Sequence, residues 1–197
     1  MSGDGGTAPE PGSGPVSEPA GIQPDDKDWT WVLERACPEC GLAAGEVETG
    51  DLARATRDVA AAWTGVLGRA GVEQRPAPAV WSPLEYGCHV RDVLRLFDER
   101  VELMLTHDDP QFANWDQDAT AVERRYHEQD PAIVAEQITA AAEVLAQRFE
   151  GVEGLQWRRP GRRSNGSEFT VAGLGRYFLH DVVHHLHDVT RPGAEVH

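Results

Sequence analysis

The apolar residues of this chain recur every three or four positions over most of its length, which is the spacing of one buried face of an α-helix. Four stretches show this pattern and predict helices over residues 49–70, 82–106, 130–149 and 171–189. A Gly-rich phosphate loop, an internal repeat and an alternating strand-like stretch are not visible. The pattern therefore predicts an all-α fold, an up-down four-helix bundle.

All four predicted helices begin with residues that helix N-termini prefer, and Thr49 or Asp51 is expected to cap the first. Ser82 and Glu85 stand in the positions of a capping box, and Pro83 suits the first helical position between them. Asp130 and Thr170 are expected to cap the third and fourth helices with their side-chain oxygens.

Composition divides the chain into four parts. Residues 1–27 are mostly small, polar or acidic and hold few large apolar side chains, so they are expected to form a disordered tail. Residues 28–47 form an N-terminal extension, residues 48–190 the bundle, and residues 191–197 a C-terminal tail. Within the bundle, the polar segment 107–129 has the length of many functional loops.

The charge balance excludes several classes of partner. The chain has 33 Asp and Glu against 18 Lys and Arg, a formal net charge of −15. This acidity opposes contact with phosphate backbones, so we expect no nucleic-acid partner. No apolar run of about 20 residues and no secretory signal is visible, so we expect no membrane partner and a cytoplasmic location. Three cysteines are too few for a secreted disulfide scaffold.

Histidines gather in the last predicted helix. His180 and His184 lie four residues apart, about 40° around a helix axis, and so share one face. Two imidazoles at this spacing can bind one metal ion. His187 lies on the same face and remains an alternative ligand, whereas His185 is rotated by roughly 100° and is predicted to point elsewhere.

A third ligand must come from another helix, and His89 on the second predicted helix is the best candidate. Three neutral imidazoles and an open position are typical of catalytic metal sites. Asp92 and Asp181 are candidate acceptors that would orient the rings. The alternative is that these histidines are ordinary core or surface residues, and the spacing alone leaves both interpretations open.

The cysteines and the basic residues also allow several interpretations. Cys37 and Cys40 form a Cys-x-x-Cys motif that can be half of a zinc site, a redox pair or a simple turn. Cys88 is expected in the core. One basic cluster precedes the last helix and can bind an anion or form a solvated turn: Arg158, Arg159, Arg162 and Arg163.

The long segment contains candidate substrate-binding residues. Trp115, Asp116 and Tyr126 would contact a substrate if segment 107–129 covers the metal. A solvated acidic loop with aromatic anchors is the alternative.

Two segments resemble the signature helices of the DinB-like superfamily. They are Trp81-Ser-Pro-Leu-Glu-Tyr-Gly-Cys-His89-Val-Arg-Asp92-Val and Leu179-His180-Asp-Val-Val-His184-His185-Leu. The resemblance covers roughly residues 48–190 and implies a four-helix bundle that holds a divalent metal ion with three histidines. It places these ligands on His89, His180 and His184. Zinc is the expected ion, with nickel or iron as alternatives.

The resemblance implies more about fold and metal than about the reaction. The superfamily includes transferases and isomerases that use mycothiol, bacillithiol or glutathione, among them mycothiol-dependent maleylpyruvate isomerases. We therefore expect a metal-dependent enzyme that activates a low-molecular-weight thiol. A metal-dependent hydrolase and a non-catalytic, stress-related metal-binding bundle are the alternatives. The resemblance assigns no catalytic residue besides the ligands, and it allows a homodimer, since DinB-like proteins often pair through helix faces.

Overall fold

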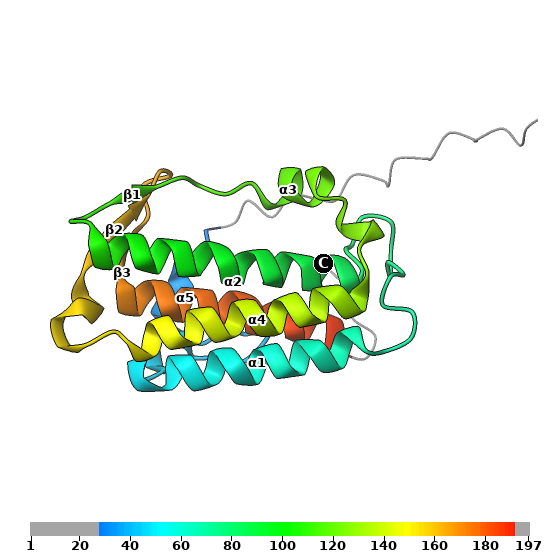
Figure 1. The fold of residues 1–197 in the computed structure, drawn as a ribbon, viewed down its shortest axis with the longest axis horizontal. Helices are drawn as coiled ribbons and strands as arrows, with labels where there is room; N and C mark the ends of the chain where they lie inside the picture. Colours follow the sequence, from blue (N-terminus) through cyan, green and yellow to red (C-terminus); the bar gives the residue numbers. More distant parts are fainter. Residues whose placement is uncertain (1–27, 192–197) are drawn as a thin grey trace, which may run out of the picture.

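Four long helices make up most of this protein in a computed structural model that describes residues 28–191 (Figure 1). They are α1 (Leu52–Leu67), α2 (Pro83–Thr106), α4 (Pro131–Glu150) and α5 (Val171–Thr190). Each begins and ends within three residues of its prediction, and the predicted helical bundle is confirmed. The predicted disordered tail and all but one residue of the predicted C-terminal tail lie outside the described residues.

The predicted caps of α2, α4 and α5 are present, whereas the cap predicted for α1 is absent: Asp51 stands at its N-cap but makes no side-chain hydrogen bond to the helix. The Glu85 backbone N–H donates to Ser82 Oγ over 3.2 Å, and the Ser82 N–H donates to Glu85 Oε2 over 2.8 Å, which completes the capping box. Asp130 accepts from the Ala132 N–H at the start of α4, and Thr170 caps α5.

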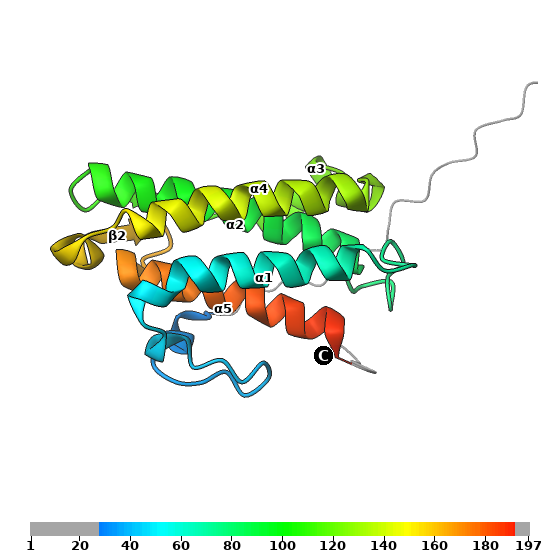
Figure 2. The same ribbon diagram turned by 60° about the horizontal axis from the view of Figure 1, so that its bottom comes forward.

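The order of the helices depends on the segment after α2. In Figure 1, α2 and α4 both run from right to left, because the chain between them returns along the bundle before α4 begins. Segment 107–129 is therefore a crossover, and it makes α2 and α4 parallel where the predicted up-down order has them antiparallel. The crossover contains strand β1 (Gln111–Phe112) and the short helix α3 (Gln117–Glu123). As a result, α1 and α2 each pack against both α4 and α5 (Figures 1 and 2).

A small sheet at one end of the bundle was not expected from the sequence. Strand β1 pairs in parallel with β2 (Pro160–Arg163), and β2 pairs antiparallel with β3 (Glu168–Thr170). Strands of two to four residues are too short to show an alternating pattern. The basic cluster mainly supports this end of the fold. Arg159 donates to the carbonyls of Met104 and His107, which closes the C-terminus of α2.

The N-terminal extension packs against α5 (Figure 2). It consists of loops and two short 3-10 helices, η1 (Thr30–Leu33) and η2 (Ala44–Glu46), and only a few of its apolar side chains are fully buried, such as Val32. Arg176 of α5 donates to the Val47 carbonyl over 2.9 Å.

Three further 3-10 helices lie elsewhere, at Thr49–Asp51, Tyr126–Glu128 and Gly154–Arg158. Within residues 28–191, no helix has an apolar stretch that could cross a membrane.

Close packing of α5 leads to a first prediction. We expect Gly175→Ala to destabilise the fold by about 1–3 kcal/mol, because its new Cβ would lie 2.8 Å from Leu52 Cδ1 and 3.2 Å from the Phe149 ring. Gly65 in α1 is the matched control, since a Cβ there meets no atom within 4 Å. Gly65→Ala should stabilise by about 0.5–1 kcal/mol through helix propensity. Urea unfolding of both variants measures the difference, and effects of equal sign would contradict the prediction.

Candidate metal centres

Helix α5 carries two pairs of potential metal ligands, each with its members four residues apart. His180 and His184 form one pair, and Asp181 and His185 form the other, rotated by about 100° around the helix axis. In the described part of the chain, groups of three or more potential ligands form in two places, and each contains one of these pairs. The two faces of α5 therefore define two separate sites.

The first site, called the α2–α5 site below, consists of His89 from α2 with Asp181 and His185 from α5. One potential ligand atom from each residue lies within 4.8 Å of the others. His89 Nε2 lies 3.3 Å from Asp181 Oδ1. The Asp188 carboxylate lies 3.2 Å from His185 Nδ1, so it holds this ring in the way that carboxylates orient metal-binding imidazoles.

Aromatic rings surround the α2–α5 site. Trp115 from the crossover stacks on His89 with ring centroids 5.3 Å apart, and Trp81 approaches the same imidazole within 5.5 Å. Tyr86 lies 5.0 Å from the ring of His185. His89 is completely buried beside these rings, whereas Asp181 and His185 are partly exposed.

The protonation states in the α2–α5 site suit metal binding. Burial lowers the pKa of His89, so its imidazole is neutral at neutral pH. Burial acts to raise the pKa of Asp181, but the hydrogen bond from His89 and the neighbouring histidines outweigh it and hold that pKa below its usual range. The site therefore offers a neutral imidazole and an ionised carboxylate, the forms that bind metal ions.

The donor atoms of the α2–α5 site fit a divalent ion. With metal–nitrogen and metal–oxygen bonds of about 2.1 Å, two tetrahedral ligands are separated by about 3.4 Å. The observed distance between His89 Nε2 and Asp181 Oδ1 is 3.3 Å. Two imidazoles and one carboxylate leave a coordination position open, which is typical of catalytic metal sites.

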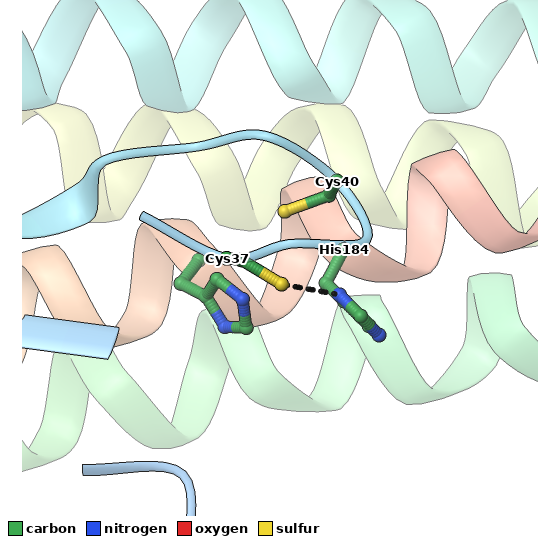
Figure 3. Close-up of side chains that lie close together, drawn as sticks. Cys37, Cys40 and His184 are labelled. Atoms are coloured by element: carbon green, nitrogen blue, oxygen red, sulfur yellow. Dashed lines mark hydrogen bonds between the residues drawn. The ribbon is translucent and has the colours of Figure 1, made fainter. Parts of the chain in front are cut away.

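The second site, called the Cys–His site below, joins the extension to α5. It consists of Cys37, Cys40, His180 and His184, whose potential ligand atoms also lie within 4.8 Å of one another. Cys37 Sγ lies 3.7 Å from His184 Nδ1 (Figure 3). Both cysteines are free thiols in the structure. Burial, reinforced by the nearby His184, lowers the pKa of His180 to about 4, so this imidazole is also neutral.

The structure groups the histidines differently from the prediction. His180 and His184 do lie together, with ring centroids 5.1 Å apart. His89 does not join them, and it lies with Asp181 and His185 instead. His185 points away from the His180/His184 pair, as predicted, but toward His89, with ring centroids 4.9 Å apart. In the described residues, the three predicted ligands therefore do not form one group.

Asp181, predicted as an acceptor for a metal-binding ring, does lie 3.3 Å from His89 Nε2. As ligands, however, Asp181 and His185 are missing from the predicted set, although a signal for them exists. Their spacing equals that of His180 and His184, and a carboxylate is as good a zinc ligand as an imidazole. His187, the alternative ligand, belongs to neither site in the described residues.

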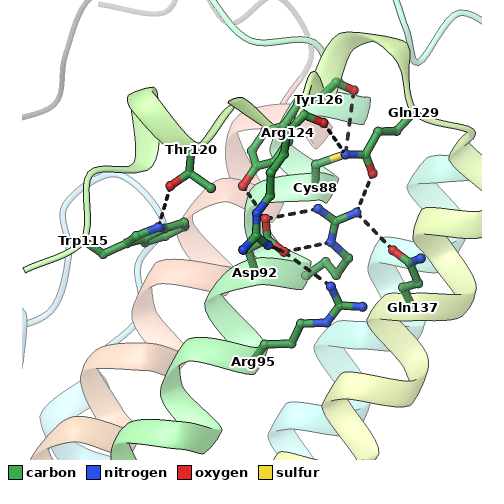
Figure 4. Close-up of polar contacts among 10 residues, drawn as sticks. Cys88, Asp92, Arg95, Trp115, Thr120, Arg124, Tyr126, Gln129 and Gln137 are labelled. Carbon is green, nitrogen blue, oxygen red and sulfur yellow. Dashed lines mark hydrogen bonds and ion pairs between the residues drawn. The ribbon is translucent and has the colours of Figure 1, made fainter. Parts of the chain in front are cut away.

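The predicted substrate-binding residues have different surroundings. Trp115 borders a potential metal ligand, as described above. Asp116 is the N-cap of α3, where it accepts from the Ala119 N–H over 2.9 Å. Tyr126 is fully buried, and its hydroxyl donates to Asp92 over 2.6 Å (Figure 4). Of the three, only Trp115 contacts a residue of the α2–α5 site, and the substrate roles remain predictions.

Asp92 belongs to a buried polar network rather than to a metal site. Arg91 donates to both of its carboxylate oxygens, over 2.9 and 3.1 Å, and Arg124 lies 2.9 Å from Oδ1 (Figure 4). The predicted role of Asp92 as an acceptor for a metal-binding ring has no contact to support it, because these partners occupy the carboxylate. Cys88 lies in the core beside this network, as predicted, and burial raises the pKa of its thiol to about 12.

Comparison with known proteins supports the predicted fold. A family model of the DinB superfamily matches residues 52–189. Among solved structures, YfiT from Bacillus subtilis matches with a TM-score of 0.64 and 14% sequence identity, over 85% of this chain and 89% of its own. YfiT is described as a probable metal-dependent hydrolase with an unusual four-helix bundle topology. No curated protein sequence matches this chain. The predicted DinB-like resemblance is confirmed.

Proposed function

This chain belongs to the DinB superfamily, and we propose that it is a metal-dependent enzyme whose divalent ion is held by His89, Asp181 and His185. The observation that carries the proposal is the ligand set itself. Three buried or half-buried donors from two facing helices converge, and they leave a coordination position for a further molecule. A purely structural site would fill that position with a fourth protein ligand.

A divalent ion at this site would lower the pKa of a thiol or a water molecule and so supply a nucleophile at neutral pH. The protein residues prepare the site for this step. Asp188 fixes the ring of His185, Trp115 stacks on the ring of His89, and Trp81 contacts that ring as well. His89 lies out of contact with bulk water, which strengthens the electrostatic interactions of this ligand.

We propose thiol activation as the first reaction and hydrolysis as the second candidate. Thiol activation is supported by the resemblance of the sequence to thiol-dependent transferases and isomerases. Hydrolysis is supported by the likeness to YfiT, a probable metal-dependent hydrolase. The two reactions use the same ligands and differ in the molecule that fills the open position, so one set of assays can separate them.

The first test is the metal dependence of activity. The full-length protein is stripped with a chelator, reloaded with zinc, nickel or iron, and assayed with low-molecular-weight thiols plus an electrophile, and separately with a panel of esters and amides. We expect activity in one of the two assays, and only after the protein has been reloaded with a metal ion. His89→Ala should reduce it more than the roughly 100-fold that removal of a ring-orienting partner costs, because a direct ligand is lost.

The control for this test is His127→Ala, which removes a surface histidine that belongs to neither site. This variant should keep its metal content and its activity. Full activity in the stripped protein or in His89→Ala would overturn the proposed function. Activity in the thiol assay alone identifies thiol activation, and activity in the ester and amide assay alone identifies hydrolysis.

A further inference from the structure

The structure assigns a second metal site to this protein: we propose that Cys37, Cys40, His180 and His184 form a closed zinc site that fixes the extension, residues 28–47, to α5. This inference does not rest on the proposed function, since the two sites share no ligand.

The spacing of the four residues is that of a structural zinc site. Two cysteines separated by two residues and two histidines separated by three are the ligand pairs of Cys2His2 sites. The segment between Cys37 and Cys40 is a tight turn, closed by a hydrogen bond of 2.9 Å from the Gly41 N–H to the Cys37 carbonyl. Gly41 has a φ of 77°, which glycine adopts without strain. Figure 3 shows this turn lying over α5, with both thiols beside His184.

The distances fit zinc. With Zn–S of about 2.3 Å and Zn–N of about 2.1 Å, tetrahedral geometry separates a sulfur from a nitrogen ligand by about 3.6 Å. Cys37 Sγ and His184 Nδ1 are 3.7 Å apart. The other nitrogen of this ring, Nε2, lies 3.5 Å from the Glu39 carboxylate. A carboxylate on the outer nitrogen orients an imidazole so that its inner nitrogen faces a metal.

His180 provides an independent indication of a missing ligand. Its side chain is buried, with the residue 4% exposed, and its Nε2 atom has no hydrogen-bond partner among the described residues. Buried polar atoms in folded proteins are nearly always paired, so such an atom calls for an explanation. A zinc ion between His180 and the other three ligands supplies the missing partner.

Electrostatics and packing favour the same assignment. Zinc binding displaces the protons of Cys37 and Cys40 to solvent, and two thiolates then neutralise the charge of the ion, so the buried site has no net charge. Trp29 covers the site from outside, with ring centroids 5.6 Å from His180 and 5.1 Å from His184. The extension has few buried apolar side chains, and a metal ion is a usual way to stabilise so small a structure.

A redox role for the cysteine pair is the main alternative. Redox-active cysteines are solvent-accessible, whereas Cys37 is only 1% exposed and faces an imidazole. With four protein ligands, the Cys–His site also leaves no open position for a substrate, in contrast to the α2–α5 site. We therefore assign it a structural role.

Cobalt substitution of the full-length protein tests this site directly. We expect an intense near-ultraviolet sulfur-to-cobalt band together with the visible bands of tetrahedral cobalt, because only the Cys–His site has thiolate ligands. The zinc-loaded protein should also protect Cys37 and Cys40 from a thiol reagent until a chelator is added. Absence of the sulfur band, or a disulfide between these two cysteines in the freshly purified protein, would overturn the assignment.

Variants separate the two sites and reveal the structural role. Cys37→Ser/Cys40→Ser should lose one metal equivalent and the sulfur band, and trypsin should then cleave after the exposed Arg35 while the bundle stays intact. Cys88→Ala is the matched control and should keep both metal and band, because Cys88 lies in the core away from the site. His89→Ala should keep the sulfur band, so failure of the proposed function leaves this result unaffected. An unchanged metal content in the double variant would contradict the inference.

Discussion

Asp92→Ala is expected to destabilise the fold by about 3–5 kcal/mol, because it leaves a buried cation without its counter-charge. Asp92 and Arg91 are only 4% and 3% exposed, and the guanidinium donates to both carboxylate oxygens (Figure 4). The Tyr126 hydroxyl would lose its acceptor as well. The free energy of unfolding, measured in urea at a fixed metal concentration, checks this prediction.

An exposed ion pair is the control for this experiment. Asp58 lies 3.2 Å from Arg54, and both side chains are about two-thirds exposed. Asp58→Ala should therefore change the free energy of unfolding by less than about 1 kcal/mol. If Asp92→Ala were no more destabilising than Asp58→Ala, the buried network would not be the structural element that we describe.

The helices of this fold could be predicted because local signals determine them. Apolar periodicity and the caps at Ser82, Asp130 and Thr170 act within one or two turns, and the sequence shows them directly. The crossover after α2 is different. Helix α3 has seven residues, and strand β1 has two, so neither element is long enough to show a period. The pairing of β1 with β2 joins segments about 50 residues apart, and this contact depends on the completed bundle.

The candidate sites could be predicted only in part, for a similar reason. The pair His180 and His184 follows from helical spacing alone. The residues that complete each site depend on the rotation of α5 within the bundle. The Cys–His site also depends on cysteines that lie about 140 residues away from these histidines along the chain. Contacts at that separation leave no pattern in one sequence. The hydrogen bond from the buried Tyr126 to Asp92 is likewise a contact that spacing does not reveal.

One signal for the rotation of α5 is nevertheless present in the sequence. Leu174 and Phe178 lie on the buried face of this helix. At about 100° per residue, His185 falls between them, roughly 20° from each. His184 lies about 80° from Leu174 and about 120° from Phe178 on the same basis. The apolar face of α5 therefore carries His185 toward α2, and His184 faces the side that the extension covers.

This geometry predicts that two histidine variants, His185→Ala and His180→Ala, each lose the metal ion of a different site. His185→Ala should remove the metal of the α2–α5 site and abolish the enzymatic activity, because a direct ligand is lost, while the sulfur-to-cobalt band of the Cys–His site remains. His180→Ala should lose that band and keep the α2–α5 metal. Metal content, the cobalt spectrum and activity are measured on both proteins, with His187→Ala as the control that should keep all three.

The outcome distinguishes the two possible ligand sets for the active metal. If that metal were bound by His89, His180 and His184, His180→Ala would abolish activity and His185→Ala would leave it intact. The structure argues against this set, since Asp181 Oδ1 lies 3.3 Å from His89 Nε2 and the His180/His184 pair faces the cysteines. The two pairs of ligands on α5 differ by one residue in sequence and therefore lie on different faces of the helix. Enzymatic assays of His180→Ala and His185→Ala determine which face binds the active metal.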